Sequence, residues 1–167
     1  MKSLSIIRHA KAAPPEKYAT DFERPLTKRG VKDIKEIAKI DANLKPAVDW
    51  IISSPAARTR ETTLILAESL GYTKTIQWEE RAYLAEAEQW LELLRNIPPD
   101  MEHVLVVGHN PGLSDLAAGL VAGAASYLNL HLPTAALAYL ELEIFWWNQI
   151  RWGCGRLHLL LPPKPLR

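Results

Sequence analysis

The feature that most constrains the fold is an apolar run near the N-terminus, Leu4-Ser5-Ile6-Ile7-Arg8-His9-Ala10, which ends in a cation and an imidazole. Such a run, rich in β-branched side chains, predicts a buried strand, and ligands bind at the carboxyl ends of strands in a parallel sheet. We therefore expect Arg8 and His9 at the mouth of a site. A neutral imidazole is a nucleophile near pH 7, and a neighbouring guanidinium lowers its pKa and attracts anions. The pair suits a phosphate, although a dipeptide is also compatible with a strand that ends in two solvated polar residues.

Apolar strand patterns alternate with helical patterns along the rest of the chain. We predict strands at 50–53, 75–78 and 103–107, and helices at 56–70, 87–96 and after 112, with a further helix that opens at Thr27 as its N-cap. Ser54 is predicted to cap the helix that has Pro55 at its start. The runs 135–145 and 150–161, joined by a short polar turn, predict an antiparallel hairpin. The fold class is therefore α/β, with a mostly parallel central sheet covered on both faces and a C-terminal antiparallel hairpin.

Composition limits the class of protein. With 167 residues, the segment 1–167 is expected to form a single domain. The 20 basic and 19 acidic side chains give no support for binding to nucleic acid or to a membrane surface. No apolar stretch approaches the ~20 residues that span a bilayer, and no secretory signal is recognised, so we expect a cytoplasmic protein. The single Cys154 excludes an intramolecular disulfide, and the histidines show no ligand spacing, so no metal is expected.

Polar side chains follow each of the four predicted parallel strands. They are Arg8 and His9 after the first, Arg58 one turn into the helix after the second, Glu80 after the third and His109 after the fourth. Because the carboxyl ends of parallel strands meet at one edge, we expect these side chains to converge. Phosphoryl transfer needs cations, an in-line nucleophile and an acid for the leaving group, and this set supplies each. Taken singly, each residue also fits a plainer role, such as a surface arginine, a loop carboxylate or a turn histidine.

Five segments occur in an order that resembles the histidine phosphatase superfamily (phosphoglycerate mutase-like), and specifically its phosphohistidine phosphatase SixA branch. They are Ile7-Arg8-His9-Ala10-Lys11, residues 21–27 (DFERPLT), residues 53–62 (SSPAARTRET), Val107-Gly108-His109-Asn110-Pro111-Gly112 and Leu132-Pro133-Thr134. The resemblance implies a three-layer α/β/α sandwich and a phospho-acceptor at His9. It also implies a phosphate pocket made by Arg8, Arg58 and His109, with Asn110 beside them. No metal or organic cofactor is implied.

Two segments depart from the family pattern. Relatives place a hydroxyl residue a few positions after the first histidine, whereas this chain reads Lys11-Ala12-Ala13-Pro14. The proton donor of the wider superfamily follows the third strand. There, Glu80-Arg81-Ala82-Tyr83 resembles the mutase form of the segment, with Glu79 adjacent. We therefore expect one phosphate contact to be missing and Glu80, or else Glu79, to be the acid.

The most favoured function is hydrolysis of phosphohistidine on a protein. No segment between the predicted strands is long enough to form a lid over a small substrate, and an open pocket suits a protruding side chain. In the expected mechanism His9 attacks the phosphorus, Arg8, Arg58 and protonated His109 stabilise the phosphoryl group, and water cleaves the phospho-His9 intermediate. The partner would be a phosphorylated protein or a small phosphorylated substrate. The alternatives are a small-molecule phosphomonoesterase acting on a sugar or nucleotide phosphate, and a weakly catalytic phosphate-binding regulatory module.

Overall fold

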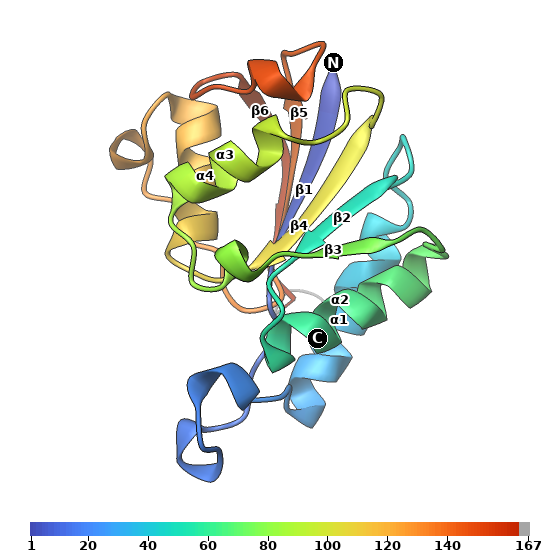
Figure 1. The fold of residues 1–167 in the computed structure, drawn as a ribbon, viewed down its shortest axis with the longest axis vertical. Helices are drawn as coiled ribbons and strands as arrows, with labels where there is room; N and C mark the ends of the chain where they lie inside the picture. The colour runs from blue at the N-terminus through green and yellow to red at the C-terminus, as the bar shows by residue number, and fades with distance from the viewer. Residues whose placement is uncertain (164–167) are drawn as a thin grey trace.

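The computed structural model describes residues 1–163, and within them six strands form one sheet. The strands are β1 (Lys2–Arg8), β2 (Trp50–Ser53), β3 (Ile76–Trp78), β4 (His103–Gly108), β5 (Leu137–Leu142) and β6 (Gly155–Leu161). They lie in the order β3-β2-β4-β1-β5-β6 (Figure 1). The first four are parallel, whereas β5 is antiparallel to β1 and to β6. This confirms a mostly parallel sheet with an antiparallel C-terminal pair.

Four helices cover the two faces of this sheet. They are α1 (Lys28–Asp41), α2 (Ala57–Leu70), α3 (Ala87–Arg95) and α4 (Gly112–Ala122), all within the part of the chain that the structure describes. Figure 1 shows α1 and α2 on one face and α3 and α4 on the other. Successive side chains of a strand point to opposite faces, so Leu4 and Ile6 pack with α3 and α4 while Ile7 packs with α1 and α2. The expected α/β/α sandwich is confirmed.

The two predicted helix caps have opposite outcomes. Thr27 caps α1 as predicted, because its Oγ1 accepts a hydrogen bond from the backbone N–H of Gly30 at 3.0 Å. The prediction for Ser54 is wrong: the N-cap of α2 is Ala56, whose backbone is extended, and no side chain caps that end. The Ser54 hydroxyl accepts a long bond from the backbone N–H of Ala56, at 3.4 Å, and lies 2.8 Å from Nε2 of His109. Ser54 is thus a polar residue near the helix start, as the pattern indicates, but its shortest hydrogen bond is to His109 on another element and not to the first turn of α2.

The antiparallel pair is correct, whereas the predicted short polar turn is wrong. Residues 143–154 join β5 to β6 and contain a 3-10 turn at Trp147–Gln149. Trp147 is fully buried, and its Nε1 donates to the carbonyl oxygen of Met101 at 2.7 Å. Trp146 is 53% exposed, and Trp152 packs at the edge of the core. The connection is long because burying the Trp147 indole requires the chain to fold back over the sheet.

The segment between β1 and α1 lies over the carboxyl ends of the parallel strands. It contains two 3-10 turns, Pro15–Lys17 and Asp21–Glu23, and is tied at its base by a bridge between Ala12 and Leu26. Figure 1 shows it projecting beyond this end of the sheet, in blue. Across residues 1–163, no helix combines the length and the apolar character needed to cross a bilayer.

Candidate active site

His9 is the first residue after β1 and is 8% exposed. Its Nδ1 lies 2.7 Å from the carbonyl oxygen of Ala10, and because a carbonyl only accepts, Nδ1 carries the hydrogen and Nε2 keeps a free lone pair. The backbone N–H of Ala10 donates to Oγ1 of Thr62 at 3.1 Å, which fixes this turn on α2. Burial lowers the pKa of His9 to about 4, opposed by the bond to Ala10 and helped by nearby arginines. His9 is therefore a neutral imidazole at pH 7 with a nucleophilic Nε2.

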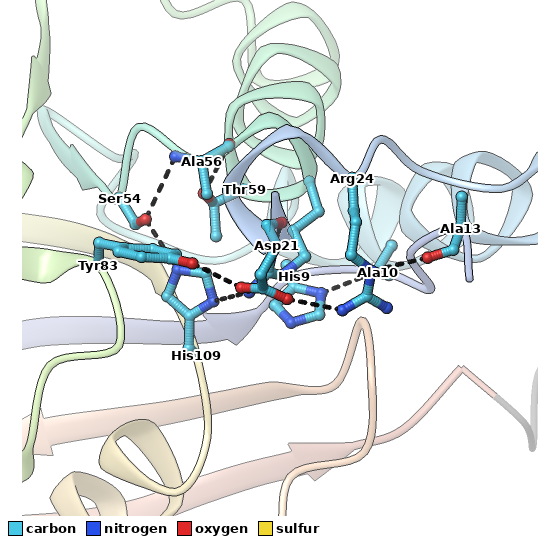
Figure 2. Close-up of polar contacts among 11 residues, drawn as sticks. His9, Ala10, Ala13, Asp21, Arg24, Ser54, Ala56, Thr59, Tyr83 and His109 are labelled. Atoms are coloured by element: carbon cyan, nitrogen blue, oxygen red, sulfur yellow. Dashed lines mark hydrogen bonds and ion pairs between the residues drawn. The ribbon is translucent and has the colours of Figure 1, made fainter. Parts of the chain in front are cut away.

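Arg58 lies in the first turn of α2 and is 4% exposed. Its Nη1 donates to the backbone oxygen of Asp21 at 2.8 Å, and its Nη2 to Oδ2 of the Asp21 carboxylate at 2.9 Å. Arg24 Nη1 donates to the other oxygen of the same carboxylate at 2.8 Å, and the Tyr83 hydroxyl donates to Oδ2 at 2.5 Å (Figure 2). These bonds, led by that of Tyr83, hold the pKa of Asp21 well below its usual range. Asp21 is thus a permanent carboxylate that orients two guanidinium groups.

His109 follows β4, and its ring lies beside Ser54 (Figure 2) and within hydrogen-bond distance of Arg58. Nη2 of Arg58 lies 3.3 Å from its Nδ1, and since a guanidinium only donates, Nδ1 accepts and Nε2–H donates to the Ser54 hydroxyl at 2.8 Å. Burial, followed by the charges of His9 when protonated and of Arg58, lowers the pKa of His109 to about 3. The imidazole is therefore neutral in this arrangement, which corrects the expectation of a protonated His109. The rings of His9 and His109 are 5.3 Å apart, centroid to centroid.

Arg8 and Asn110 meet at the carbonyl oxygen of Leu132. Arg8 Nη1 donates to it at 3.1 Å and Asn110 Nδ2 at 2.7 Å. Oδ1 of Asn110 accepts from the backbone and the hydroxyl of Ser114, at 3.2 and 2.8 Å. The buried Nε of Arg8 has no hydrogen-bond partner among the described residues. Asn110 therefore positions the loop before β5, while Arg8 keeps donors for a ligand; burial and Arg58 lower the pKa of Arg8.

These residues surround a cavity of about 320 Å³, which we call the phosphate cavity. Its lining consists of Arg8, His9, Lys11, Ala12, Arg24, Arg58, Leu84, His109, Asn110 and Thr134. Four of these side chains are cationic, and no aspartate or glutamate is among the described residues that line the cavity. The Lys11-Ala12-Ala13-Pro14 segment has no hydroxyl, but Thr134, in the loop before β5, carries one and also lines the cavity. A cavity of this charge and size fits a phosphoryl group.

The structure brings together five of the residues singled out from sequence, namely Arg8, His9, Arg58, His109 and Asn110. It does not bring Glu80 to them, because Glu80 begins a 3-10 turn, is exposed and does not line the phosphate cavity. Glu79 is taken up by Arg81, whose Nε lies 3.0 Å from its Oε1 and which lowers the pKa of Glu79. The same turn instead places Tyr83 with its ring 5.3 Å from that of His109. Neither glutamate is thus placed as the expected acid.

Sequence reasoning missed four contributors: Asp21, Arg24, Tyr83 and Thr134. Asp21 and Arg24 lie in the irregular segment after β1, where no periodicity shows which side chains turn inward. The signals were the resemblance of residues 21–27, of Leu132-Pro133-Thr134 and of Glu80-Arg81-Ala82-Tyr83 to family segments.

Residues 4–90, more than half of the chain, match the profile of the Histidine phosphatase superfamily (branch 1). The chain belongs to this superfamily. This histidine phosphatase is 34% identical over 158 residues to an uncharacterized protein of Mycobacterium tuberculosis, which covers 90% of this chain and 96% of that one. Arg8, His9 and Arg58 lie within the matched segment, whereas His109 and Thr134 lie beyond it. The fold brings both sets of residues together in the phosphate cavity.

Solved structures place the histidine phosphatase near the SixA branch. A candidate phosphohistidine phosphatase SixA from Nakamurella multipartitia superposes with a TM-score of 0.83 at 27% identity, covering 96% of both chains. A second, from Agrobacterium tumefaciens, gives 0.80 at 28% identity, covering 97% of this chain and 98% of that one. These matches confirm the family, its branch and the fold expected from the sequence.

Proposed function

We propose that this histidine phosphatase hydrolyses phosphohistidine on a protein through a phospho-His9 intermediate. The observation that carries the proposal is the lining of the phosphate cavity, which joins four cations to the neutral imidazoles of His9 and His109 and, within the described residues, contains no carboxyl group. An alkyl phosphate expels a poor alkoxide and needs a positioned acid. A phosphohistidine expels an imidazole, which picks up its proton from solvent near pH 7. A site without an acid therefore favours the phosphohistidine.

The groups next to the cavity do not replace that acid. The Asp21 carboxylate is held ionised by Tyr83, Arg24 and Arg58, so it has no proton to give. Burial and the bond to Asp21 raise the pKa of the Tyr83 hydroxyl, which keeps its proton in that bond. The identity of 27% and 28% to two candidate SixA proteins supports the same substrate class.

The proposed reaction has two displacements at phosphorus. Nε2 of His9 attacks the phosphoryl group, the phosphorus–nitrogen bond of the substrate breaks, and the departing imidazole takes a proton from water. Arg8 and Arg58 balance the charge on the phosphoryl oxygens in both steps. Water then attacks the phospho-His9 phosphorus, and the bond to Nε2 breaks with its electron pair returning to nitrogen. One hydrogen of that water stays on the new phosphate oxygen, and the other leaves as a proton to phosphate or solvent.

The test compares two peptides of the same sequence, one with phosphohistidine and one with phosphoserine. We expect kcat/KM to be at least roughly 100-fold higher for the phosphohistidine peptide, the usual contribution of a general acid that this site lacks. His9→Ala should abolish turnover and the acid-labile, base-stable phosphoenzyme, with Arg60→Lys on the exposed side of α2 as the matched control. Equal rates on both peptides would favour the small-molecule phosphomonoesterase. Stoichiometric phosphate binding without turnover would favour the regulatory module.

A further inference from the structure

A second cavity, of about 420 Å³, adjoins the phosphate cavity, and we call it the flanking groove. Leu84 lines both cavities, and the chain passes directly from Asn110 in the first to Pro111 in the second. A substrate whose phosphoryl group lies against His9 must extend out of the phosphate cavity. The route over Leu84 leads it into the groove.

The junction between the cavities is an exposed apolar side chain. Leu84 is 55% exposed and has a φ of 52°, a left-handed conformation that residues with a Cβ rarely adopt. The far wall is the indole of Trp152, whose Nε1 donates to Oε1 of Glu88 at 3.0 Å. A Cβ on Gly119 would lie 2.8 Å from this indole, so the glycine lets the ring pack closely against α4. The groove thus offers a fixed apolar surface that continues from the catalytic residues.

The charge of the groove is opposite to that of the phosphate cavity. Glu86, Glu88 and Asp115 line it with exposed carboxylates, whereas no cationic side chain within residues 1–163 lines it. Lys and Arg carry aliphatic stems that cover apolar surface and charged heads that stay in water or meet carboxylates and aromatic faces. The two adjoining cavities are therefore complementary to a phosphoryl group followed by a basic, partly aliphatic chain.

We infer that the flanking groove binds the polypeptide next to the phosphohistidine and selects lysine or arginine there. This inference rests on the proposed function and adds the chemistry of the substrate around the phosphorylated residue. The stem of the basic side chain lies along Leu84 and Trp152, and its head lies among Glu86, Glu88 and Asp115.

The experiment uses two phosphohistidine peptides that differ only in residues flanking the phosphohistidine, lysine in one and glutamate in the other. For the wild-type enzyme at low salt we expect kcat/KM to favour the lysine peptide about tenfold, and the preference to shrink in 0.5 M salt because exposed charges are screened. The double variant Asp115→Asn, Glu88→Gln should lose most of the preference. Gln keeps an acceptor for Trp152, so the wall stays in place. The ratio of the two peptides within one enzyme is independent of the fraction that is folded.

The matched control is Glu68→Gln, Asp100→Asn, which removes the same charge from exposed positions outside both cavities and should keep the full preference. Equal wild-type rates on the two peptides would overturn the groove inference while leaving the proposed function intact. A preference that survives in the groove variant would also overturn it. Turnover of neither phosphohistidine peptide would instead refute the proposed function, and the groove inference with it.

Discussion

Ser5, Asp41 and His103 form a buried cluster between α1 and the sheet, and its geometry predicts how the free energy of unfolding depends on pH. Oγ of Ser5 lies 2.9 Å from Oδ1 of Asp41 and 2.9 Å from Nε2 of His103. Nδ1 of His103 lies 2.7 Å from the carbonyl oxygen of Pro46, so Nδ1 carries the hydrogen and a neutral His103 offers Nε2 as an acceptor. One hydroxyl proton cannot serve two acceptors, so the cluster requires a further proton.

The surroundings place that proton on Asp41. Burial raises the pKa of this carboxyl to about 6 from an ordinary value of 3.8, and the hydrogen bond from Ser5 opposes that rise. Oδ2 of Asp41 has no hydrogen-bond partner among the described residues. Burial lowers the pKa of His103, opposed by Pro46 and by Asp49, whose carboxylate accepts from the His103 backbone. Because the folded protein binds the Asp41 proton more tightly than the unfolded chain, this stabilisation is complete below about pH 4 and is lost as the pH rises through 6. A shift of about two units corresponds to roughly 3 kcal/mol.

The perturbation is Asp41→Asn, which keeps an acceptor for Ser5 and removes the ionisable group. We expect the free energy of unfolding of the variant, relative to wild type, to rise by up to roughly 3 kcal/mol between pH 4 and pH 7.5. Urea unfolding at several pH values measures this difference, from which the titrations of histidines outside the cluster cancel. Asp100→Asn, at an exposed position, is the control and should show no such trend. A difference between wild type and Asp41→Asn that is constant with pH would refute the reasoning.

Two further substitutions test the catalytic site through kcat/KM on the phosphohistidine peptide. Arg58→Lys should lower kcat/KM by the equivalent of about 2 to 4 kcal/mol, because a lysine point charge cannot replace the guanidinium fork that holds Asp21 and the phosphoryl oxygens. The control, Arg60→Lys, should change kcat/KM by no more than about twofold. Equal small effects of the two substitutions would make Arg58 a structural residue. Glu80→Gln should also cost less than about twofold, since its side chain does not line the phosphate cavity, and a loss near 100-fold would restore its role as the acid.

The strands and the convergence of the main site residues could be predicted from the sequence, for a physical reason. Strands such as β1 and β4 are apolar on both sides because helices cover both faces of the sheet. Once the strands are parallel, the residues after them meet at one edge, whatever the details of the loops. His9, Arg58 and His109 are of this kind, and the structure places all three in one cavity.

The parts that could not be predicted depend on contacts between loops. Asp21 reaches Arg58 only because the segment after β1 folds back over the sheet, and no pattern in residues 11–25 encodes that path. Ser54 satisfied every local rule for an N-cap, yet its hydroxyl bonds to His109. The expected role of Glu80 is not supported for a similar reason. The 3-10 turn that begins at Glu80 brings the Tyr83 side chain, and not that of Glu80, to Asp21.

The position of β4 between β2 and β1 has a consequence for how the chain reaches its folded state during synthesis. Strand β1 pairs only with β4 and β5 in the described sheet, so Ser3 finds its partners at His103 and Glu141. A nascent chain leaving the ribosome therefore carries its first strand, with the apolar side chains of Leu4, Ile6 and Ile7, without a neighbour while α1, β2, α2, β3 and α3 emerge. Contacts this distant in sequence slow folding and expose apolar surface to aggregation or chaperones. His9, the proposed nucleophile, is among the first residues made, yet it acquires its phosphate cavity only after the last parallel strand has been inserted beside β1.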